Sequence, residues 1–287
     1  MNPIWVAGEA LVDILPNGEE KFVIGGGAAN TAKSLGALEV AVQFIGSISN
    51  DFYGKKIIEE LERYNVGLDF VNHCLLPTAS AEVTLDPLGN AKYQFNLKQR
   101  ATFDFNKLWL PVGIPSILHI GSLATVIEPG AKALFNWASR LTAPIIFDPN
   151  IRASVIENKR DYQSRVLPWL RIARVIKLSE DDLAFLDISV EQLLKIGAEL
   201  VILTHGVNGI SAITNSAKIH TPAIKVSVID TIGAGDTVGA ITAELLSMNF
   251  DLSESYLAKL LKRASLAAAI TCSRKGAVPP RNSEITS

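Results

Sequence analysis

One short stretch of the chain combines a glycine-rich turn with a carboxylate. Gly233 and Gly235 are followed directly by Asp236, and apolar residues at helical spacing continue over residues 237–247. A glycine-rich turn that opens a helix presents free backbone N–H groups and the positive end of the helix dipole, so it attracts phosphate. A carboxylate there would repel the anion, unless it takes the proton from a hydroxyl that attacks the phosphorus. The alternative is structural, because an Asp in the first turn of a helix is stabilised by the dipole. By itself the stretch leaves both interpretations open.

Two other glycine-loop motifs fit this stretch less well. A Walker A loop needs Lys followed by Ser or Thr after its last glycine, and Asp236 and Thr237 stand there instead. A dinucleotide fingerprint should return to a strand that carries an acid about 20 residues later. Here residues 253–272 have the pattern of another helix. Both of these motifs are therefore disfavoured.

Further polar residues stand where ligands are expected in an α/β protein. Asp13 alternates with apolar neighbours, and a second glycine run, 25–27, opens an expected helix that carries Asn30. Asp13 could equally lie on the outer face of a strand, and Asn30 could be a solvated helix residue or a contact for a polyhydroxyl ligand. An Asp-Pro-Asn-Ile-Arg segment at 148–152 and a Ser-Glu-Asp-Asp segment at 179–182 each follow an apolar run. Ligands bind outside the carboxyl ends of parallel strands, so both segments are candidates.

The composition predicts a large globular domain. The chain has 287 residues, of which 48% are hydrophobic, enough for one large α/β domain. Its net charge is −2 without a run of Lys or Arg, so we expect neither a nucleic acid nor a membrane as partner. We expect no secretory leader and no membrane span. The two cysteines fit a reducing cytoplasm, and the four histidines are scattered, which makes a zinc site improbable.

Alternating apolar runs and helical patterns predict the elements that would position these groups. Buried strands are expected near residues 4–8, 40–45, 117–121, 144–148, 174–178, 200–206 and 226–229. Helices are expected up to residue 38 and over residues 51–63, 237–247 and 253–272. This alternation predicts a mostly parallel sheet covered on both faces. Two hairpins interrupt it, one over 79–97 with its turn at 86–90 and one over 209–220. The first is expected to project as a small separate sheet.

Taken together, these motifs resemble the signatures of the ribokinase-like (PfkB) family of carbohydrate kinases, and within it the fructokinases. Residues 230–236, Asp-Thr-Ile-Gly-Ala-Gly-Asp, resemble the highly specific C-terminal signature, and Gly-Gly-x-x-x-Asn at 25–30 resembles the N-terminal one. The resemblance extends from residues 8–13 to 271–277, nearly the whole chain. It implies a single domain over residues 1–287 with a Rossmann-like, mostly parallel sheet flanked by helices. It also implies a small β-sheet lid formed by about 11–24 and 79–97.

The resemblance implies roles for individual residues. Asp236 corresponds to the general base, and the N–H groups of Gly233, Ala234 and Gly235 correspond to an anion hole. Sugar contacts are implied at Asp13, Gly26, Gly27, Asn30, Lys98 and Arg152. Nucleotide contacts are implied at Lys177, Ser179, Thr204, Gly206, Gly233 and Gly235. Asp182 stands where much of the family has the longer Glu, so a water-mediated contact with Mg²⁺ is expected. The backbone around Asp230, Ile232 and Gly276 would hold a monovalent cation such as K⁺.

The resulting hypothesis is a kinase that uses ATP and Mg²⁺ to phosphorylate a sugar hydroxyl. Fructose is favoured, although Gly27, Ala28 and Ile232 depart from residues common in fructokinases. A kinase of 2-keto-3-deoxygluconate or of a nucleoside stays open, as does a catalytically silent sugar-binding regulator. The intact Asp236 argues against the regulator, since a binding module needs no base in an anion site. Finally, the apolar face of Tyr93, Phe95 and Leu97 predicts a homodimer through the lid.

Overall fold

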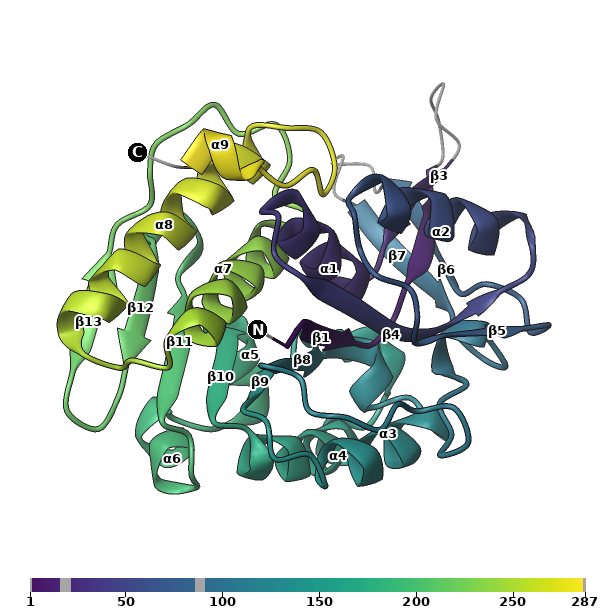
Figure 1. Ribbon diagram of the computed structural model, residues 1–287, viewed down its shortest axis with the longest axis horizontal. Helices are drawn as coiled ribbons and strands as arrows, with labels where there is room; N and C mark the ends of the chain where they lie inside the picture. The colour runs from purple at the N-terminus through teal and green to yellow at the C-terminus, as the bar shows by residue number, and fades with distance from the viewer. Residues whose placement is uncertain (1, 16–21, 86–90, 286–287) are drawn as a thin grey trace.

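A central sheet organises the molecule (Figure 1). The computed structural model describes residues 2–15, 22–85 and 91–285, and in these a nine-stranded sheet has the order β13-β12-β11-β10-β9-β8-β1-β4-β5. Neighbouring strands pair in parallel except for the antiparallel β12 and β13 at one edge. The strands are β1 (Ile4–Ala7), β4 (Val42–Ser49), β5 (Val71–Cys74), β8 (Leu118–Gly121), β9 (Ile145–Asp148), β10 (Val175–Ser179), β11 (Leu200–Thr204), β12 (Ile210–Ile213) and β13 (Lys218–Thr221).

Helices cover both faces of this sheet, as the alternation of the sequence predicted. One face carries α1 (Gly27–Ala37), α2 (Phe52–Arg63), α7 (Ala234–Met248) and α8 (Glu254–Cys272), with the short α9 (Asn282–Ile285) against α8. The other face carries α3 (Gly130–Ala138), α4 (Lys159–Ile172), α5 (Glu180–Leu186) and α6 (Val190–Lys195). Strands buried on both faces are apolar along their whole length, which explains the continuous apolar runs in the sequence. Within the described residues, no helix is long and apolar enough to cross a membrane.

The inner strand β1 contributes side chains to the hydrophobic cores on both faces of the sheet. Ile4 and Val6 pack against α1, α7 and α8, whereas Trp5 and Ala7 point to the opposite core beside α3 and α4. Successive side chains of a strand point to opposite faces, so both sets are buried. A ligand would reach the sheet at the carboxyl end of this strand.

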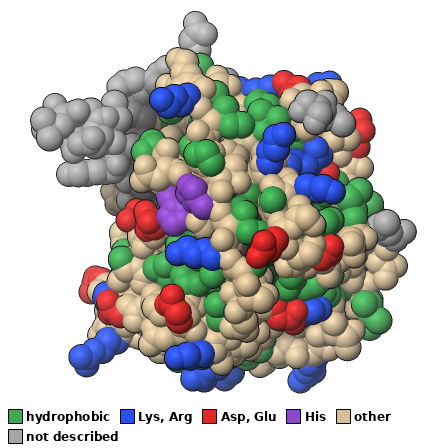
Figure 2. All heavy atoms as spheres, turned by 90° about the vertical axis from the view of Figure 1, so that its left-hand side faces the viewer, with side chains coloured by type: hydrophobic (Ala, Val, Ile, Leu, Met, Phe, Trp, Pro, Cys, Tyr) green, Lys and Arg blue, Asp and Glu red, His purple; other side chains and the backbone are tan. Residues whose placement is uncertain are grey.

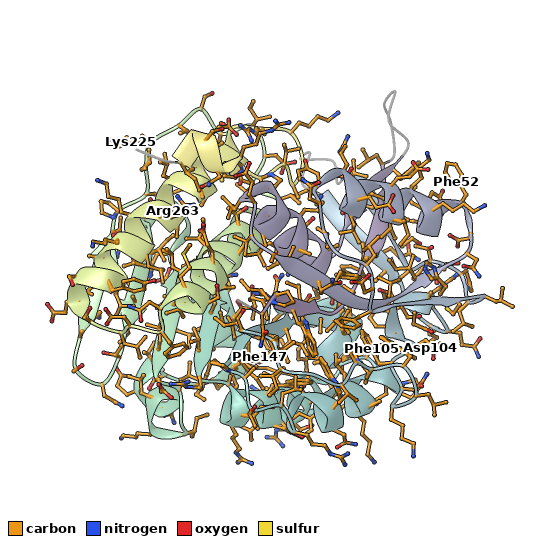
Figure 3. All side chains as sticks on the ribbon, in the orientation of Figure 1. Phe52, Asp104, Phe105, Phe147, Lys225 and Arg263 are labelled. Carbon is orange, nitrogen blue, oxygen red and sulfur yellow. The ribbon has the colours of Figure 1, made fainter. Side chains whose placement is uncertain are left out.

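Two contacts illustrate how the helices are fixed, one between a helix and the sheet and one between two helices of the same layer. The ring of Phe147 on β9 stacks on that of Trp169 on α4, with centroids 5.8 Å apart. On the opposite side, Arg263 of α8 binds Glu244 of α7 through both guanidinium nitrogens facing it, at 2.9 and 2.8 Å. Figure 3 labels Phe147 below the sheet and Arg263 on α8. The long helix α7 is therefore anchored on its outer side as well as on the sheet.

A second, smaller sheet stands beside the main one. In the described part of the chain it has four strands in the order β3-β2-β6-β7, namely β2 (Leu11–Ile14), β3 (Phe22–Gly25), β6 (Ser80–Leu85) and β7 (Ala91–Asn96). The separate sheet predicted from 11–24 and 79–97 is therefore present, although its turn at 86–90 and the side chain of Tyr93 lie outside the described residues. Phe95 and Leu97 are half-buried and pack against a small core that includes Leu11. The apolar face that predicted a dimer is thus partly covered by the protein itself.

The predicted strand at 226–229 is wrong. Residues 222–233, all of them described, form neither helix nor strand, and Val228 and Ile229 are 59% and 65% exposed. The antiparallel β13 is the edge strand here, and the segment does not pair with it. Its backbone instead donates to the end of α8, from Ile229 N to Cys272 O at 2.8 Å. In addition, α7 begins at Ala234, three residues before the predicted start, which places Asp236 in its first turn.

Candidate functional site

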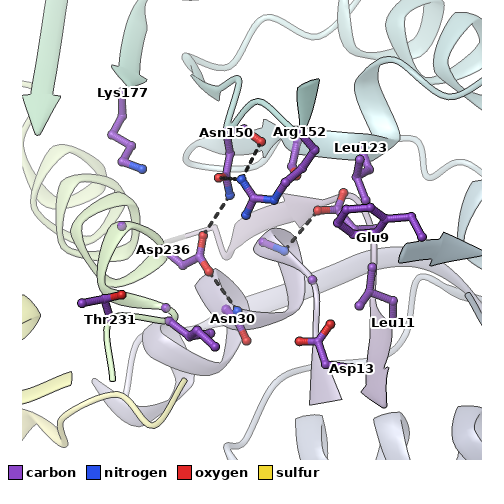
Figure 4. Close-up of a pocket in the computed structure, with 17 residues that line it drawn as sticks. Glu9, Leu11, Asp13, Asn30, Leu123, Asn150, Arg152, Lys177, Thr231 and Asp236 are labelled. Atoms are coloured by element: carbon purple, nitrogen blue, oxygen red, sulfur yellow. Dashed lines mark hydrogen bonds between the residues drawn. The ribbon is translucent and has the colours of Figure 1, made fainter. Parts of the chain in front are cut away.

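A cavity of about 390 Å³ lies between the first turns of α1 and α7 and the small sheet (Figure 4). The carboxyl ends of β1 and β9 form its floor, as expected for a parallel sheet. It brings together many of the residues predicted for the site, far apart in the sequence: Asp13, Gly26, Gly27, Asn30, Arg152, Lys177, Ile232, Gly233, Gly235 and Asp236.

The carboxylate of Asp236 is held by two amides from other elements. Its Oδ2 accepts a hydrogen bond from Asn30 Nδ2 at 2.9 Å, and its Oδ1 a long one from Asn150 Nδ2 at 3.5 Å. Asp236 is 7% exposed, and burial raises its pKa, against the opposing effects of Lys177, Asn30 and Arg152. A raised pKa makes a carboxylate a better proton acceptor. Since its oxygens face amides across the cavity, this geometry is closer to that of a positioned base than to that of a helix cap.

The two asparagines extend this arrangement in opposite directions. Asn30 Oδ1 is buried and has no hydrogen-bond partner within the described residues, so this amide oxygen is available to a ligand hydroxyl. Asn150 Oδ1 accepts from Arg152 Nη1 at 2.7 Å, which fixes the orientation of the amide that faces Asp236. Asn150 lies in the segment 148–152, which the sequence had marked as a candidate because it follows a strand.

Glu9 joins two backbone segments at the floor of the cavity. Its Oε1 accepts from Gly27 N and its Oε2 from Ala124 N, both at 3.1 Å, and burial raises its pKa to about 7. A Cβ on Gly27 would lie 3.1 Å from Asn150 Nδ2 and 3.5 Å from Asp236 Oδ1, so only glycine leaves this approach open. Sequence reasoning missed Glu9 as a site residue, because its only signal was its place directly after the first strand.

A second carboxylate faces the cavity from the small sheet. Asp13 of β2 lies opposite Asp236, and Phe95 of β7 adds an apolar wall beside it. Burial raises the pKa of Asp13 to about 6, and the guanidinium of Arg152 opposes this effect. Above that pH Asp13 is an acceptor for hydroxyl hydrogens. The cavity therefore presents acceptors on two sides and an apolar surface between them, as a sugar requires.

Positive charge gathers on the side of the glycine turn. Gly233 has φ 80°, a left-handed conformation that favours glycine, and a Cβ on Gly235 would lie 3.0 Å from Lys177 Nζ. Lys177 is buried and forms an ion pair with Asp148, Nζ to Oδ2, at 2.8 Å. Burial alone would lower the pKa of Lys177, but the nearby carboxylates, that of Asp148 first, raise it. A retained ammonium beside a helix N-terminus suits a phosphate group.

Several predicted nucleotide and metal residues lie outside this cavity, at the ends of β10 and β11. Both oxygens of Asp182 bind the chain: Oδ2 accepts from the N and Oγ of Ser179 at 2.8 and 2.7 Å, and Oδ1 accepts from Ile151 N at 2.9 Å. Ser179 and Asp182 form a capping box for α5. Thr204 follows on the neighbouring strand, where its hydroxyl donates to Leu178 O at 3.4 Å. Gly206 lies in the turn beyond it.

Two of the four histidines meet beside Thr204, although the sequence had suggested that all were scattered. The rings of His205 and His220 lie 5.6 Å apart, and the histidines form one patch on the face of Figure 2. His205 also contacts Glu180 Oε1 through Nδ1 and Ser211 Oγ through Nε2, both at 2.8 Å. Among the described residues, no three His, Cys, Asp or Glu side chains converge as a metal site.

The remaining predicted residues divide between two places. Asp230 ties the loop before α7 to the loop after α8, since its Oδ1 accepts from Ile232 N and its Oδ2 from Gly276 N, both at 3.0 Å. Ala234 is the first residue of α7. Lys98 is exposed and lines a second, larger cavity of about 1200 Å³, away from Asp236. The structure therefore separates Lys98 from the other residues predicted to contact the sugar.

Comparison with known proteins identifies the family. The model of the pfkB family carbohydrate kinases matches residues 7–284. A fructokinase of Klebsiella pneumoniae is 30% identical over 96% of this chain and 94% of its own length. The structure of a Xylella fastidiosa fructokinase with bound ATP has a TM-score of 0.90 at 25% identity, covering 99% of this chain and 96% of that one. A double mutant of a Vibrio cholerae fructokinase, bound to fructose, ADP and potassium ion, has a TM-score of 0.87 at 26% identity, covering 99% and 97%. The chain therefore belongs to the PfkB family of carbohydrate kinases and is a phosphotransferase.

Proposed function

We propose that this kinase transfers the γ-phosphoryl group of ATP to a hydroxyl of fructose, with Asp236 as the general base. The observation that carries the proposal is the buried carboxylate of Asp236, held by Asn30 and Asn150 in a cavity that also presents Asp13. The names of the relatives support the choice of sugar, as does the neighbour bound to fructose and ADP.

The proposed chemistry is one in-line displacement. Asp236 accepts the proton of the sugar hydroxyl, so that the O–H bond breaks while the oxygen forms a bond to the γ-phosphorus. The bond between that phosphorus and the oxygen bridging to the β-phosphorus breaks, and ADP leaves with the electron pair. Little covalent work falls to the protein in such a transfer, so positioning and charge stabilisation provide most of the rate.

The turn before α7 is proposed to bind the transferring phosphoryl group. The first turn of α7 directs its dipole toward the cavity, and Lys177 lies directly beside Gly235. Both stabilise the negative charge that spreads over the phosphoryl oxygens in the transition state. Asp236 in the same turn is then close to both reacting groups, which explains why a carboxylate stands in an anion site.

The sugar is proposed to lie between the two sheets. A cavity of about 390 Å³ is within the size range of small-molecule sites. Asp13 and the unpartnered Oδ1 of Asn30 would accept hydroxyl hydrogens, and Phe95 would cover an apolar face of the sugar. The small sheet would thereby act as a lid that keeps water from the phosphoryl group.

The residues present do not form a direct binding site for Mg²⁺. Both oxygens of Asp182 are engaged by the chain, and no three candidate ligands converge in the described part of the chain. Mg²⁺ usually keeps several waters and is bound largely by substrate phosphates. We therefore assign it to the nucleotide rather than to a cage of side chains, with at most a water-mediated contact to Asp182.

A monovalent cation is proposed to act on the loops that Asp230 joins. This carboxylate already connects Ile232 N with Gly276 N, and backbone carbonyls of the same loops could bind K⁺. A cation there would order the turn that binds phosphate. We expect faster turnover in potassium than in a buffer whose only cation is a bulky organic ammonium. Equal rates in potassium, sodium and that buffer would contradict the proposal.

An assay of ADP release over a panel of acceptors tests the substrate. Fructose should give the highest kcat/KM, above 2-keto-3-deoxygluconate and adenosine, with the same enzyme and ATP concentration throughout. A higher kcat/KM for either of those two would replace fructose by that class of acceptor. If a sugar binds but no acceptor in the panel leads to ADP release, the result would point to a binding protein.

A further inference from the structure

A third and much smaller cavity lies behind Asp236. It has a volume of about 10 Å³ and lies between the carboxyl ends of β8 and β9 and the first turns of α1 and α7. Among the side chains that line it are those of His119, Asp148 and Asp236. This volume is near the lower limit for a cavity that holds one ordered water.

Two residues that line this cavity carry buried polar atoms without a hydrogen-bond partner within the described residues. The atoms are both ring nitrogens of His119 and Oδ1 of Asp148, and each residue is 3% exposed. Nε2 of His119 faces α7, because a Cβ on Gly239 would lie 2.8 Å from it. Buried polar atoms are nearly always paired, with the protein or with ordered water. Leaving such an atom unpaired costs about 1–3 kcal/mol, so unpaired atoms on two residues of one cavity indicate a bound partner.

The charge states of these groups identify what the partner must offer. Burial, with the nearby charge of Lys177, lowers the pKa of His119 to about 3, so at neutral pH the ring has one N–H donor and one acceptor nitrogen. Asp148 is ionised above about pH 6, and an ionised carboxylate only accepts hydrogen bonds. A water molecule supplies two donors for the two carboxylates and accepts from the His119 N–H. A cation fits less well, because the ammonium of Lys177 already binds Asp148.

We propose that one ordered water occupies this cavity, donates to Asp148 and Asp236 and accepts from His119, which makes His119 a positioning residue for the general base. The part that concerns catalysis rests on the proposed role of Asp236, whereas the water site itself does not. His119 touches no substrate in this arrangement. It acts on Asp236 only through the water.

The proposed water has a measurable effect on the catalytic carboxylate. A hydrogen bond donated to an ionised carboxylate lowers its pKa, so loss of that bond should raise the pKa of Asp236. The other groups that face Asp236 from the surrounding elements stay in place: Asn30, Lys33, Asp148, Asn150, Arg152 and Lys177. A shift seen on changing His119 would therefore report the water.

Two variants of His119 separate positioning from packing. His119→Phe keeps a ring but removes the N–H, so the acid limb of kcat against pH should move up by about half to one pH unit. His119→Gln retains a donor and should keep the limb of the parent enzyme. The KM for the sugar should be unchanged in both. Equal shifts in the two variants, or no shift in His119→Phe, would overturn the positioning role.

A crystal structure of the parent enzyme tests the site without any variant or assay. Density for one water within about 3.2 Å of His119 and Asp148 is expected at high resolution. An empty cavity, or a cation identified by its anomalous signal, would overturn the proposal. Asp236→Asn distinguishes the two levels: if it keeps parental turnover, the general base is wrong although the water can still be present. If it loses turnover while the cavity is dry, only the water is wrong.

Discussion

The two halves of the site differ in how their polar groups are used. Around Asp236, buried acceptors face the cavity, and Asn30 Oδ1 has no partner within the described residues. At the ends of β10 and β11, by contrast, the polar atoms of Ser179 and Asp182 bind one another and the backbone. The first half keeps hydrogen-bonding capacity for a ligand, whereas the second uses it to hold its own loops.

This difference separates catalysis from stability. Burial raises the pKa of Asp13, of Glu9 and of Asp236, which means that the folded chain holds these carboxylates at a cost. Such perturbed acids in a cavity are typical of functional sites. The capping box of Ser179 and Asp182 instead stabilises a helix. Changes in the first half should therefore alter kinetics, and changes in the second should alter folding.

The largest expected effect follows removal of the charge at Asp236. Asp236→Asn should lower kcat by about 10² to 10⁴, the range for a positioned base, with little change in either KM. Steady-state kinetics would measure it, with Asp181→Asn as control, since Asp181 is an exposed acid of α5. A variant that keeps more than about a tenth of the parental kcat would contradict the catalytic role, because that loss is smaller than the range for a removed base.

The next largest effect should come from the small sheet. Asp13→Ala removes charge-assisted hydrogen bonds worth roughly 1.5–3 kcal/mol each, so the sugar KM should rise by about tenfold or more. The KM for the nucleotide should not change. Glu82→Ala is the matched control, because Glu82 is an exposed acid of the neighbouring strand β6. Equal sugar KM values for both variants would remove Asp13 from the binding site.

In the other half of the site the expected effect is on stability. Asp182→Ala leaves the N–H groups of Ser179 and Ile151 without their acceptors, and should lower the free energy of unfolding by about 1–3 kcal/mol. Denaturant unfolding would measure this, and kcat should change far less than in Asp236→Asn. An unchanged unfolding midpoint with a large rise in the Mg²⁺ requirement would instead show that Asp182 binds the metal.

The smallest effect is a change in pH dependence. The pKa of Asp13 is raised to about 6, and only its ionised form accepts hydroxyl hydrogens, so kcat/KM for the sugar should fall as the pH drops through about 6. Asp13→Asn cannot titrate there, and its acid limb should be shallower than that of the parent. Rate profiles from about pH 5 to 8 would compare them. Identical limbs would assign the titration to another group.

Local sequence patterns predicted much of the fold because they depend on neighbours in the chain. Asp51 was a plausible N-cap for the helix over 51–63, and its Oδ1 accepts from Gly54 N at 2.7 Å. The continuous apolar runs predicted a parallel sheet that is buried on both faces. The strand predicted at residues 226–229 was wrong, because β-branched residues favour a strand but do not determine whether a neighbouring strand pairs with it. In the structure the segment bonds to the end of α8 instead of to the edge strand β13.

The sequence by itself therefore determined the class of the fold and marked Asp236, Asp13 and Asn30 as residues of one site. Only the tertiary structure decided how they meet and what else joins them. Glu9 and His119 look like ordinary residues of apolar runs, and they gain their roles from burial and from groups contributed by distant elements. It also placed Lys98 outside the cavity. Periodicity and turn chemistry are local, whereas desolvation and the convergence of charges depend on the packing of the whole chain.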